Sequence, residues 1–478
     1  MSTSTYHTRG YLIIYALVFG AILFSFLVAF IGFIVIENGT QRVKMEKEGA
    51  LQIAEAGLDY YKWYLSHFPT DVTNGTGSPG PYVHSYEDPE LGVIGEFSLD
   101  VEANTVCGDI ASIDIHSTGT IASNPDISRT VYGRYARPTV AEFAYIINSN
   151  VWAGADRVIM GPYHSNGGVR MDGTNQSTVS SGVETWLCTP GFGCSPTTTR
   201  NGVFGAGPNN DLWSFPSPPI SFTGLSVDLA LIKAKAQGSG RYFAPSGNFG
   251  YHIVFRNNGT FDLYRVTGTQ SVAGYTTEAG WASERHIISS QTLVGNYTIP
   301  PSCSVIFVED KLWIDGTLTN KVTIAAANVI TAGVAPDLIL EGNITYATST
   351  AGLLAVGEGS VLIPLDSPDV MTINGIFVAQ TGRFGRNHYC QSECDSDNPG
   401  NEGVSNALDP YVTQTSLTVN GTIVSNGREG TKWTSGATVV SGYETRTNSY
   451  DRKLVSDPPP LTPYTSDTYK FIEWREEN

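Results

Sequence analysis

The first 65 residues carry the apolar pattern of one long helix. Residues 11–36 contain no formally charged side chain, and at about 1.5 Å per residue they exceed a hydrocarbon core of roughly 30 Å. Farther on, apolar residues recur at spacings of three and four, namely Leu51, Ala54, Leu58, Tyr61 and Leu65. The pattern predicts a helix that can span a membrane, becomes amphipathic, and ends no later than Pro69.

A second pattern alternates apolar and polar side chains and covers residues 92–137. It is clear in Ile113–Ile115 and in Thr130–Tyr135. A period of two residues is typical of half-buried strands. We therefore expect a small sheet over residues 69–140.

Beyond residue 140, an apolar-x-apolar triplet followed by Asp, Glu or Asn and then Gly occurs five times. The copies are Val169–Gly173, Leu312–Gly316, Leu338–Gly342, Met371–Gly375 and Leu417–Gly421. The triplet directs two side chains inward, the polar residue is expected to begin a turn, and Gly supplies a positive φ or a bulge. This pattern favours a parallel β-helix, a solenoid of stacked coils.

An antiparallel sandwich is the alternative, because Asn-Gly and Asp-Gly also form hairpins. Nearly continuous runs of apolar and small residues at 323–327 and 353–356 favour buried solenoid strands. The predicted fold class is mainly β with one long N-terminal α-helix. We expect this helix and a small sheet to be followed by a solenoid over residues 141–478.

Three insertions interrupt the solenoid pattern, near residues 182–217, 218–300 and 385–405. The second contains a predicted helix over 226–237 and a hairpin with its turn at 257–259. The first and third each hold two nearby cysteines, the disulfide candidates Cys188 with Cys194 and Cys390 with Cys394. Long loops on a rigid scaffold are where function usually lies.

Composition and charge narrow the function further. Acidic residues number 45 against 28 basic ones, a formal charge of −17, which disfavours nucleic acid as a partner. The eight histidines are scattered, and the sequence has neither a Gly-x-Ser-x-Gly motif nor a Gly-Lys-Ser/Thr phosphate loop. We therefore predict no catalytic residues and no enzyme activity.

One acidic segment has the oxygen-rich composition that Ca²⁺ prefers. The candidate metal ligands are Glu393, Asp395, Asp397 and Glu402. A solvated acidic loop is the alternative, and no other cofactor is expected.

The junction Arg9-Gly10-Tyr11 lies directly before the apolar helix and resembles the type III signal of prepilins and pseudopilins. The resemblance implies that residues 1–10 are a leader, that a prepilin peptidase cuts after Gly10, and that Tyr11 is then methylated. Most family members have glutamate as the fifth mature residue, where this chain has Tyr15. Tip-type pseudopilins and some minor pilins share that departure.

Residues 54–58, Ala-Glu-Ala-Gly-Leu, resemble a signature of PilX-like minor pilins and related pseudopilins. The predicted helix covers residues 11–68. The residues through which it is expected to pack against other subunits in a fibre are Leu51, Ala54, Glu55, Gly57 and Leu58. Residues 305–382 and 450–476 are similar to large β-rich proteins that share such an N-terminus.

The resemblance implies a minor pilin or tip-type pseudopilin of a type IV pilus-like fibre, acting in initiation, capping or adhesion. Its partners would be other pilin subunits, the prepilin peptidase, the membrane, and a surface or glycan ligand. It would reside in the cytoplasmic membrane and then at the cell surface. The alternatives are an envelope protein with a plain anchor and a surface β-helix protein that binds or cleaves polysaccharide, with Asp172, Asp315 and Glu341 as acidic candidates.

Overall fold

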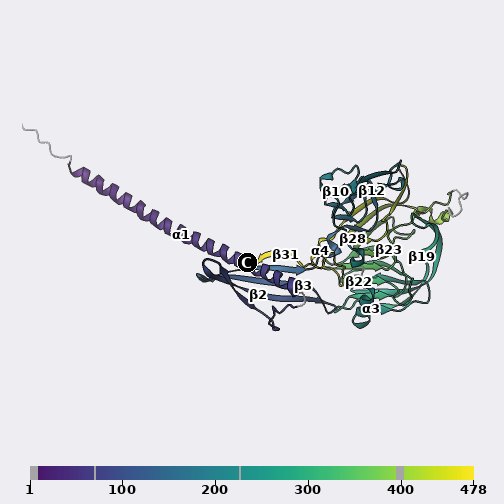
Figure 1. Cartoon of the computed structure of the whole chain (residues 1–478), viewed down its shortest axis with the longest axis horizontal. Helices are drawn as coiled ribbons and strands as arrows, with labels where there is room; N and C mark the ends of the chain where they lie inside the picture. Colours follow the sequence, from purple (N-terminus) through teal and green to yellow (C-terminus); the bar gives the residue numbers. More distant parts are fainter. Residues whose placement is uncertain (1–8, 69–70, 226–227, 395–402, 478) are drawn as a thin grey trace, which may run out of the picture. The chain divides into compact units, whose positions relative to one another are not determined.

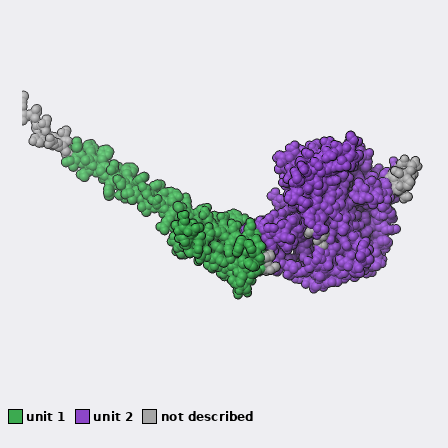
Figure 2. All heavy atoms as spheres, viewed as in Figure 1, with its two compact units in different colours: residues 1–103, 113–135, 473–478 green, residues 104–112, 136–472 purple. Residues whose placement is uncertain are grey.

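The computed structural model describes residues 9–68, 71–225, 228–394 and 403–477. The chain divides into two compact units, coloured separately in Figure 2. The first contains residues 1–103, 113–135 and 473–478, and the second contains residues 104–112 and 136–472. The chain is mainly β with one long N-terminal helix, so the predicted fold class is confirmed.

The first unit consists of helix α1 (Arg9–His67) and a five-stranded sheet (Figure 1). The sheet order is β1 (Tyr82–Asp88), β2 (Gly92–Val106), β3 (Asp109–Ile121), β4 (Asn124–Ala136) and β31 (Lys470–Glu477). The helix ends two residues before Pro69, within the predicted limit. The predicted solenoid region, residues 141–478, includes this last strand, but in the structure the strand joins the first sheet.

Strands of the second unit pair in parallel ladders. The longest runs, in spatial order, through β16 (Arg241–Phe243), β20 (Val305–Val308), β22 (Lys321–Ala326), β24 (Gly352–Gly357), β26 (Val370–Ala379), β28 (Thr413–Ser425), β5 (Tyr145–Ile147), β8 (Tyr163–Ser165), β11 (Val179–Ser181) and β15 (Trp213–Ser214). The second runs through β17 (Gly250–Phe255), β21 (Leu312–Leu318), β23 (Leu338–Tyr346), β26, β28, β30 (Thr438–Ser449), β7 (Arg157–Ile159) and β10 (Thr174–Asn175). Parallel ladders of this kind fit the solenoid interpretation.

Two further parallel ladders are shorter. One contains β23, β25 (Val361–Leu362) and β27 (Phe384–Gly385), and the other contains β6 (Val151–Ala153), β9 (Val169–Met171) and β14 (Val203–Phe204). Antiparallel hairpins join β12 (Thr185–Cys188) with β13 (Thr198–Asn201), β17 with β18 (Thr260–Thr276), β18 with β19 (Gly280–Thr298), and β29 (Lys432–Ser435) with β30. The hairpin of β17 with β18 confirms the one predicted around residues 257–259.

The stacking order differs from the order in the sequence. Strand β28, late in the chain, pairs in parallel with β5, the first strand of this unit, and Ile423 lies opposite Tyr145. The first coils of the unit are therefore stacked on its last ones.

The repeated motif bends strands rather than ending them. In β26 and β28 two copies lie in register, with Gly375 opposite Gly421. Their φ angles are 150° and 147°, and that of Gly316 is 107°. The predicted turn is wrong for the four copies inside β21, β23, β26 and β28, and neither Gly173 nor Gly342 has a positive φ.

Apolar side chains fill the inside of the stacked coils. Ile314, Leu340, Ile373 and Val419 come from successive coils and are at most 1% exposed. A second cluster lies under α3 (Leu229–Gly238), whose N-cap Asp228 accepts a hydrogen bond from the Leu231 amide. This helix confirms the one predicted from residue 226 onward. The remaining helical turns are α2 (Phe222–Leu225), α4 (Arg452–Ser456), Val140–Glu142, Pro190–Phe192, Asn210–Leu212 and Asn406–Tyr411.

Candidate functional site

The N-terminal part of α1 presents apolar side chains with nothing from the described chain over them. Residues 11–45 are all exposed, with Leu12 73% and Phe26 73% accessible. By length and composition, α1 can cross a membrane. The predicted cleavage position, Gly10 and Tyr11, lies in the first turn of this helix.

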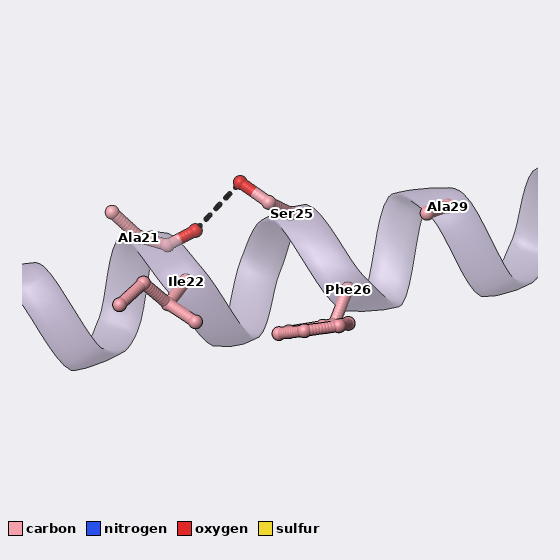
Figure 3. Close-up of a pocket in the computed structure, with 5 residues that line it drawn as sticks. All are labelled: Ala21, Ile22, Ser25, Phe26 and Ala29. Atoms are coloured by element: carbon pink, nitrogen blue, oxygen red, sulfur yellow. Dashed lines mark hydrogen bonds between the residues drawn. The ribbon is translucent and has the colours of Figure 1, made fainter.

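The polar side chain of Ser25 is satisfied within the helix. Its hydroxyl donates to the Ala21 carbonyl oxygen over 2.8 Å, next to Ile22, Phe26 and Ala29 on an open helix face (Figure 3). Thr40 donates to the Ile36 carbonyl in the same way. Such back-bonding satisfies the hydroxyls of these two residues within the helix, which lowers the cost of placing them in an apolar phase.

Farther along α1, most of the predicted fibre-packing residues are covered by the chain's own sheet. Ala54 and Leu58 are buried, and a Cβ at Gly57 would collide with the side chains of Ser117 and Phe97. Leu51 is half-buried and Glu55 is exposed. This differs from the prediction that Ala54, Gly57 and Leu58 contact other subunits, because the first unit already occupies that helix face.

All six cysteines are paired. Cys188 joins Cys194 and Cys390 joins Cys394, the two candidate pairs, with Cα–Cα distances of 5.6 and 5.9 Å. A third disulfide joins Cys107 to Cys303 across 196 positions. Sequence reasoning missed that bond, because only the folded chain brings the two residues together.

The predicted calcium ligands lie mostly outside the described residues. Asp395, Asp397 and Glu402 belong to the segment 395–402, and Glu393 is exposed. Among described residues, no group of three or more His, Cys, Asp or Glu is placed to hold a metal ion. The calcium site stays a prediction.

Two of the three acidic candidates lie on neighbouring strands. A Cβ at Gly342 would lie 3.3 Å from the Asp315 carboxylate, so Asp315 lies beside Glu341. Burial, followed by the negative charges of Asp366 and Asp315, raises the pKa of Glu341 to about 9. This places a protonated carboxyl beside two other acids at neutral pH.

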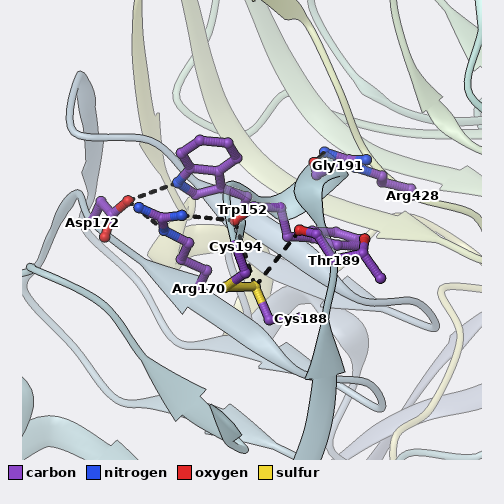
Figure 4. The surroundings of a disulfide bond; sticks show 9 residues. Trp152, Arg170, Asp172, Cys188, Thr189, Gly191, Cys194 and Arg428 are labelled. Carbon is purple, nitrogen blue, oxygen red and sulfur yellow. Dashed lines mark hydrogen bonds and ion pairs between the residues drawn. A yellow bond between two sulfur atoms is a disulfide. The ribbon is translucent and has the colours of Figure 1, made fainter. Parts of the chain in front are cut away.

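The third acidic candidate belongs to another environment. The Asp172 carboxylate accepts hydrogen bonds from the Trp152 indole and the Arg170 guanidinium, both over 2.8 Å (Figure 4). A third bond comes from the Ala206 amide. Asp172 therefore has a structural set of partners.

The second unit also contains a cavity of about 400 Å³ lined by aromatic and charged side chains. We call it the aromatic–arginine cleft and define it by Trp152, Tyr275, Trp433, Arg383 and Arg428. Its walls include part of the disulfide-closed loop after β12, the hairpin β18–β19 and the segment that leads into β29. Two of the predicted insertions therefore meet at one site.

Comparisons with known proteins give little further information. No protein-family model and no curated protein matches the chain. Among solved structures, the chain is similar to the competence-associated pilin ComZ from Thermus thermophilus, at 12% identity and a TM-score of 0.28, over 90% of this chain and 97% of that chain. A likeness at this TM-score carries no argument about fold or function.

Proposed function

We propose that this protein is a type IV pilin-like subunit, a minor pilin or tip-type pseudopilin, that is held in the membrane before it joins a fibre. The observation that carries the proposal is the division of α1 into two parts. Its first 35 helical residues from Tyr11 are exposed and largely apolar, whereas the later turns pack on the sheet of the first unit. Such a helix needs lipid, and then neighbouring helices, to cover its apolar surface.

The proposed maturation follows from the start of that helix. A prepilin peptidase would cleave between Gly10 and Tyr11, and methylation would convert the new primary amine of Tyr11 into a secondary amine, which still carries a positive charge. The apolar residues that follow would then contact other pilin subunits in the fibre. Ala54 and Leu58 stay with the chain's own sheet.

The size of the second unit supports a place at the fibre tip. It contains residues 104–112 and 136–472, and repetition of such a head at every subunit would crowd a thin shaft. We propose that it initiates or caps the fibre, or attaches it to a surface, and that it binds a ligand without catalysis. The polysaccharide-acting alternative would need the Asp315, Glu341 and Asp366 carboxylates to turn over a glycan.

The proposal is tested by comparing two glycine variants in cells. Gly10→Val should leave unprocessed protein in the membrane and remove it from the fibres that shearing releases. Gly20→Val is the matched control, because nothing lies within 4 Å of a Cβ at that position in α1. Wild-type amounts of Gly10→Val in sheared fibres would contradict the proposal.

A further inference from the structure

The aromatic–arginine cleft is large enough for a small ligand. Its volume of about 400 Å³ lies within the range of pockets that hold small molecules. Tyr275 comes from the hairpin β18–β19, whereas Trp433 lies on β29 and Trp152 on β6. Segments that are far apart in the sequence therefore supply the aromatic side chains of one cavity.

The aromatic side chains are held in place by their polar atoms. The Trp433 indole donates to the Arg386 carbonyl over 3.1 Å, and its ring lies 5.8 Å from that of Tyr275. The Trp152 indole donates to Asp172, and Arg170 stacks 4.3 Å from its ring centre (Figure 4). Trp152 is nevertheless 38% exposed. These rings are fixed yet accessible, as stacking against a ligand requires.

The acidic residues of the cleft are mostly neutralised by partners of their own. Asp156 accepts two hydrogen bonds from Arg446, each 3.0 Å, and lies 3.4 Å from Lys432. Glu429 is paired with the buried Arg157, with the closest N–O distance 2.7 Å. These two carboxylates are therefore not available to neutralise the other arginines.

Neither Arg383 nor Arg428 forms an ion pair with a carboxylate among the described residues, although the negative charge of Glu278 in the same lining acts on both. Arg428 donates to the Gly191 carbonyl over 2.9 Å and stacks on Phe192, and Arg383 donates to the Asn387 side-chain oxygen. A guanidinium has five N–H donors, so most of those on each residue remain unused. Burial lowers the pKa of both groups, because desolvation disfavours the charged form and the negative charge of Glu278 offsets this only in part.

This cationic lining contrasts with the rest of the chain. The protein has a formal charge of −17, yet four cations against three carboxylates line the cleft. A carboxylate-bearing ligand would pair with the free guanidinium donors in a bidentate way. An aromatic surface beside them fits the apolar face of a sugar ring, and the exposed Glu278 at the rim can accept from a hydroxyl.

We infer that the aromatic–arginine cleft binds an acidic saccharide, with Arg383 and Arg428 on its carboxylate and Trp152, Tyr275 and Trp433 against its ring. A bare phosphate would use the arginines and leave the aromatic walls without a role. The inference goes beyond the pilin-like role and does not depend on it, since every residue involved belongs to the second unit.

The test is a titration of full-length protein in detergent, followed by tryptophan fluorescence and calorimetry. The probes are tri(galacturonic acid) and sialyllactose, with the methyl ester of the first, lactose, and inorganic phosphate for comparison. At least one acidic saccharide should bind at least tenfold more tightly than its neutral counterpart and than phosphate. A tenfold factor corresponds to about 1.4 kcal/mol.

Variants separate ligand recognition from folding. Arg383→Gln and Arg428→Gln should each weaken binding at least tenfold, and the exposed Arg285→Gln should leave it unchanged. Glu278→Gln should strengthen binding of the acidic probe about twofold or more, because it removes a negative charge that acts on Arg383 and Arg428 and would repel the carboxylate of the probe. Gln keeps a side-chain oxygen that can accept from a hydroxyl. A purely structural cleft would not show that gain.

The inference would be overturned if neither acidic saccharide binds, if the neutral counterparts bind as tightly as the acidic ones, or if phosphate alone binds as tightly as the acidic saccharides. A folded Arg428→Gln protein with unchanged affinity for the acidic saccharide would also contradict the proposed pairing of arginine with the carboxylate of the ligand. None of these results bears on cleavage after Gly10, so the two proposals fail independently.

Discussion

At the scale of single residues, Gly421 of the repeated motif has no room for a larger side chain. Gly421 has a φ of 147°, and a Cβ there would collide with the backbone of Gly375 in the adjacent coil. We expect Gly421→Ala to lower the free energy of unfolding by at least about 2 kcal/mol, measured by urea unfolding with tryptophan fluorescence.

Gly436→Ala is the control for backbone conformation alone. Its φ is 61°, but nothing lies within 4 Å of an added Cβ. It should cost only about 1 kcal/mol, the penalty of the left-handed region. Equal effects of the two substitutions would show that close approach of adjacent coils is not the reason for glycine at 421.

Glu341 predicts a pH dependence of stability. Its pKa rises from the ordinary 4.5 to about 9 on folding, so the folded chain holds this proton more tightly than the unfolded chain. The stabilisation that the protonated Glu341 carboxyl contributes to the free energy of unfolding is fully present below about pH 4.5 and is lost as pH rises toward 9. Glu341→Gln should therefore match the wild type at pH 5 and exceed its unfolding free energy by about 1–3 kcal/mol at pH 8.

The comparison uses the exposed Glu444→Gln as its control. That variant should show the same pH profile as the wild type. A Glu341→Gln protein that follows the wild-type profile at every pH would mean that the carboxyl titrates normally in the fold.

The roles of single residues could be predicted from the sequence where they depend on residues close by in the chain. The glycines at 316, 375 and 421 and the two short cysteine pairs follow from neighbouring residues. Arg383 and Arg428 could not be foreseen as a pair, because 45 positions separate them and nothing local distinguishes them from other arginines. Their importance depends on which carboxylates the fold brings near.

At the scale of elements, the disulfide between Cys107 and Cys303 closes the longest covalent loop. Replacement of both residues by Ala should lower the unfolding free energy by about 2–5 kcal/mol, since the unfolded chain regains much conformational entropy. The Cys188/Cys194 double variant should cost less, because its loop spans only six positions.

Peptide mapping without reduction identifies the bonds directly, and urea unfolding gives the two energies. A crosslinked peptide that joins Cys107 to any cysteine other than Cys303 would refute this pairing. A larger loss for the short loop than for the long one would refute the entropic explanation.

Elements with a clear period were predictable, and their pairing was not. The apolar stripe of α1, the helix α3 and the hairpin of β17 with β18, whose turn was predicted at 257–259, all follow from nearby residues. The pairing of β28 with β5 could not be read from the sequence, because parallel partners can lie hundreds of residues apart. The same holds for β31, which lies at the far end of the chain from the sheet that it joins.

At the scale of the whole molecule, a helix with an exposed apolar half accompanies a large β unit with its own core. The sequence predicts this division into an apolar helix and a β-rich part, since charged residues are absent from 11–36 and glycines are abundant elsewhere. The exposed part of the helix would account for the proposed anchoring and assembly, and the proposed ligand cleft would give a reason for the size of the β unit. The two functions are proposed for separate parts of one chain.

The most direct test of the pilin-like assignment is the mass of the N-terminal peptide from protein isolated at the cell surface. The account predicts that this peptide begins at Tyr11 and carries one added methyl group on its amine. A surface protein that still begins with residues 1–9 would contradict it, and the helix would then be a plain membrane anchor.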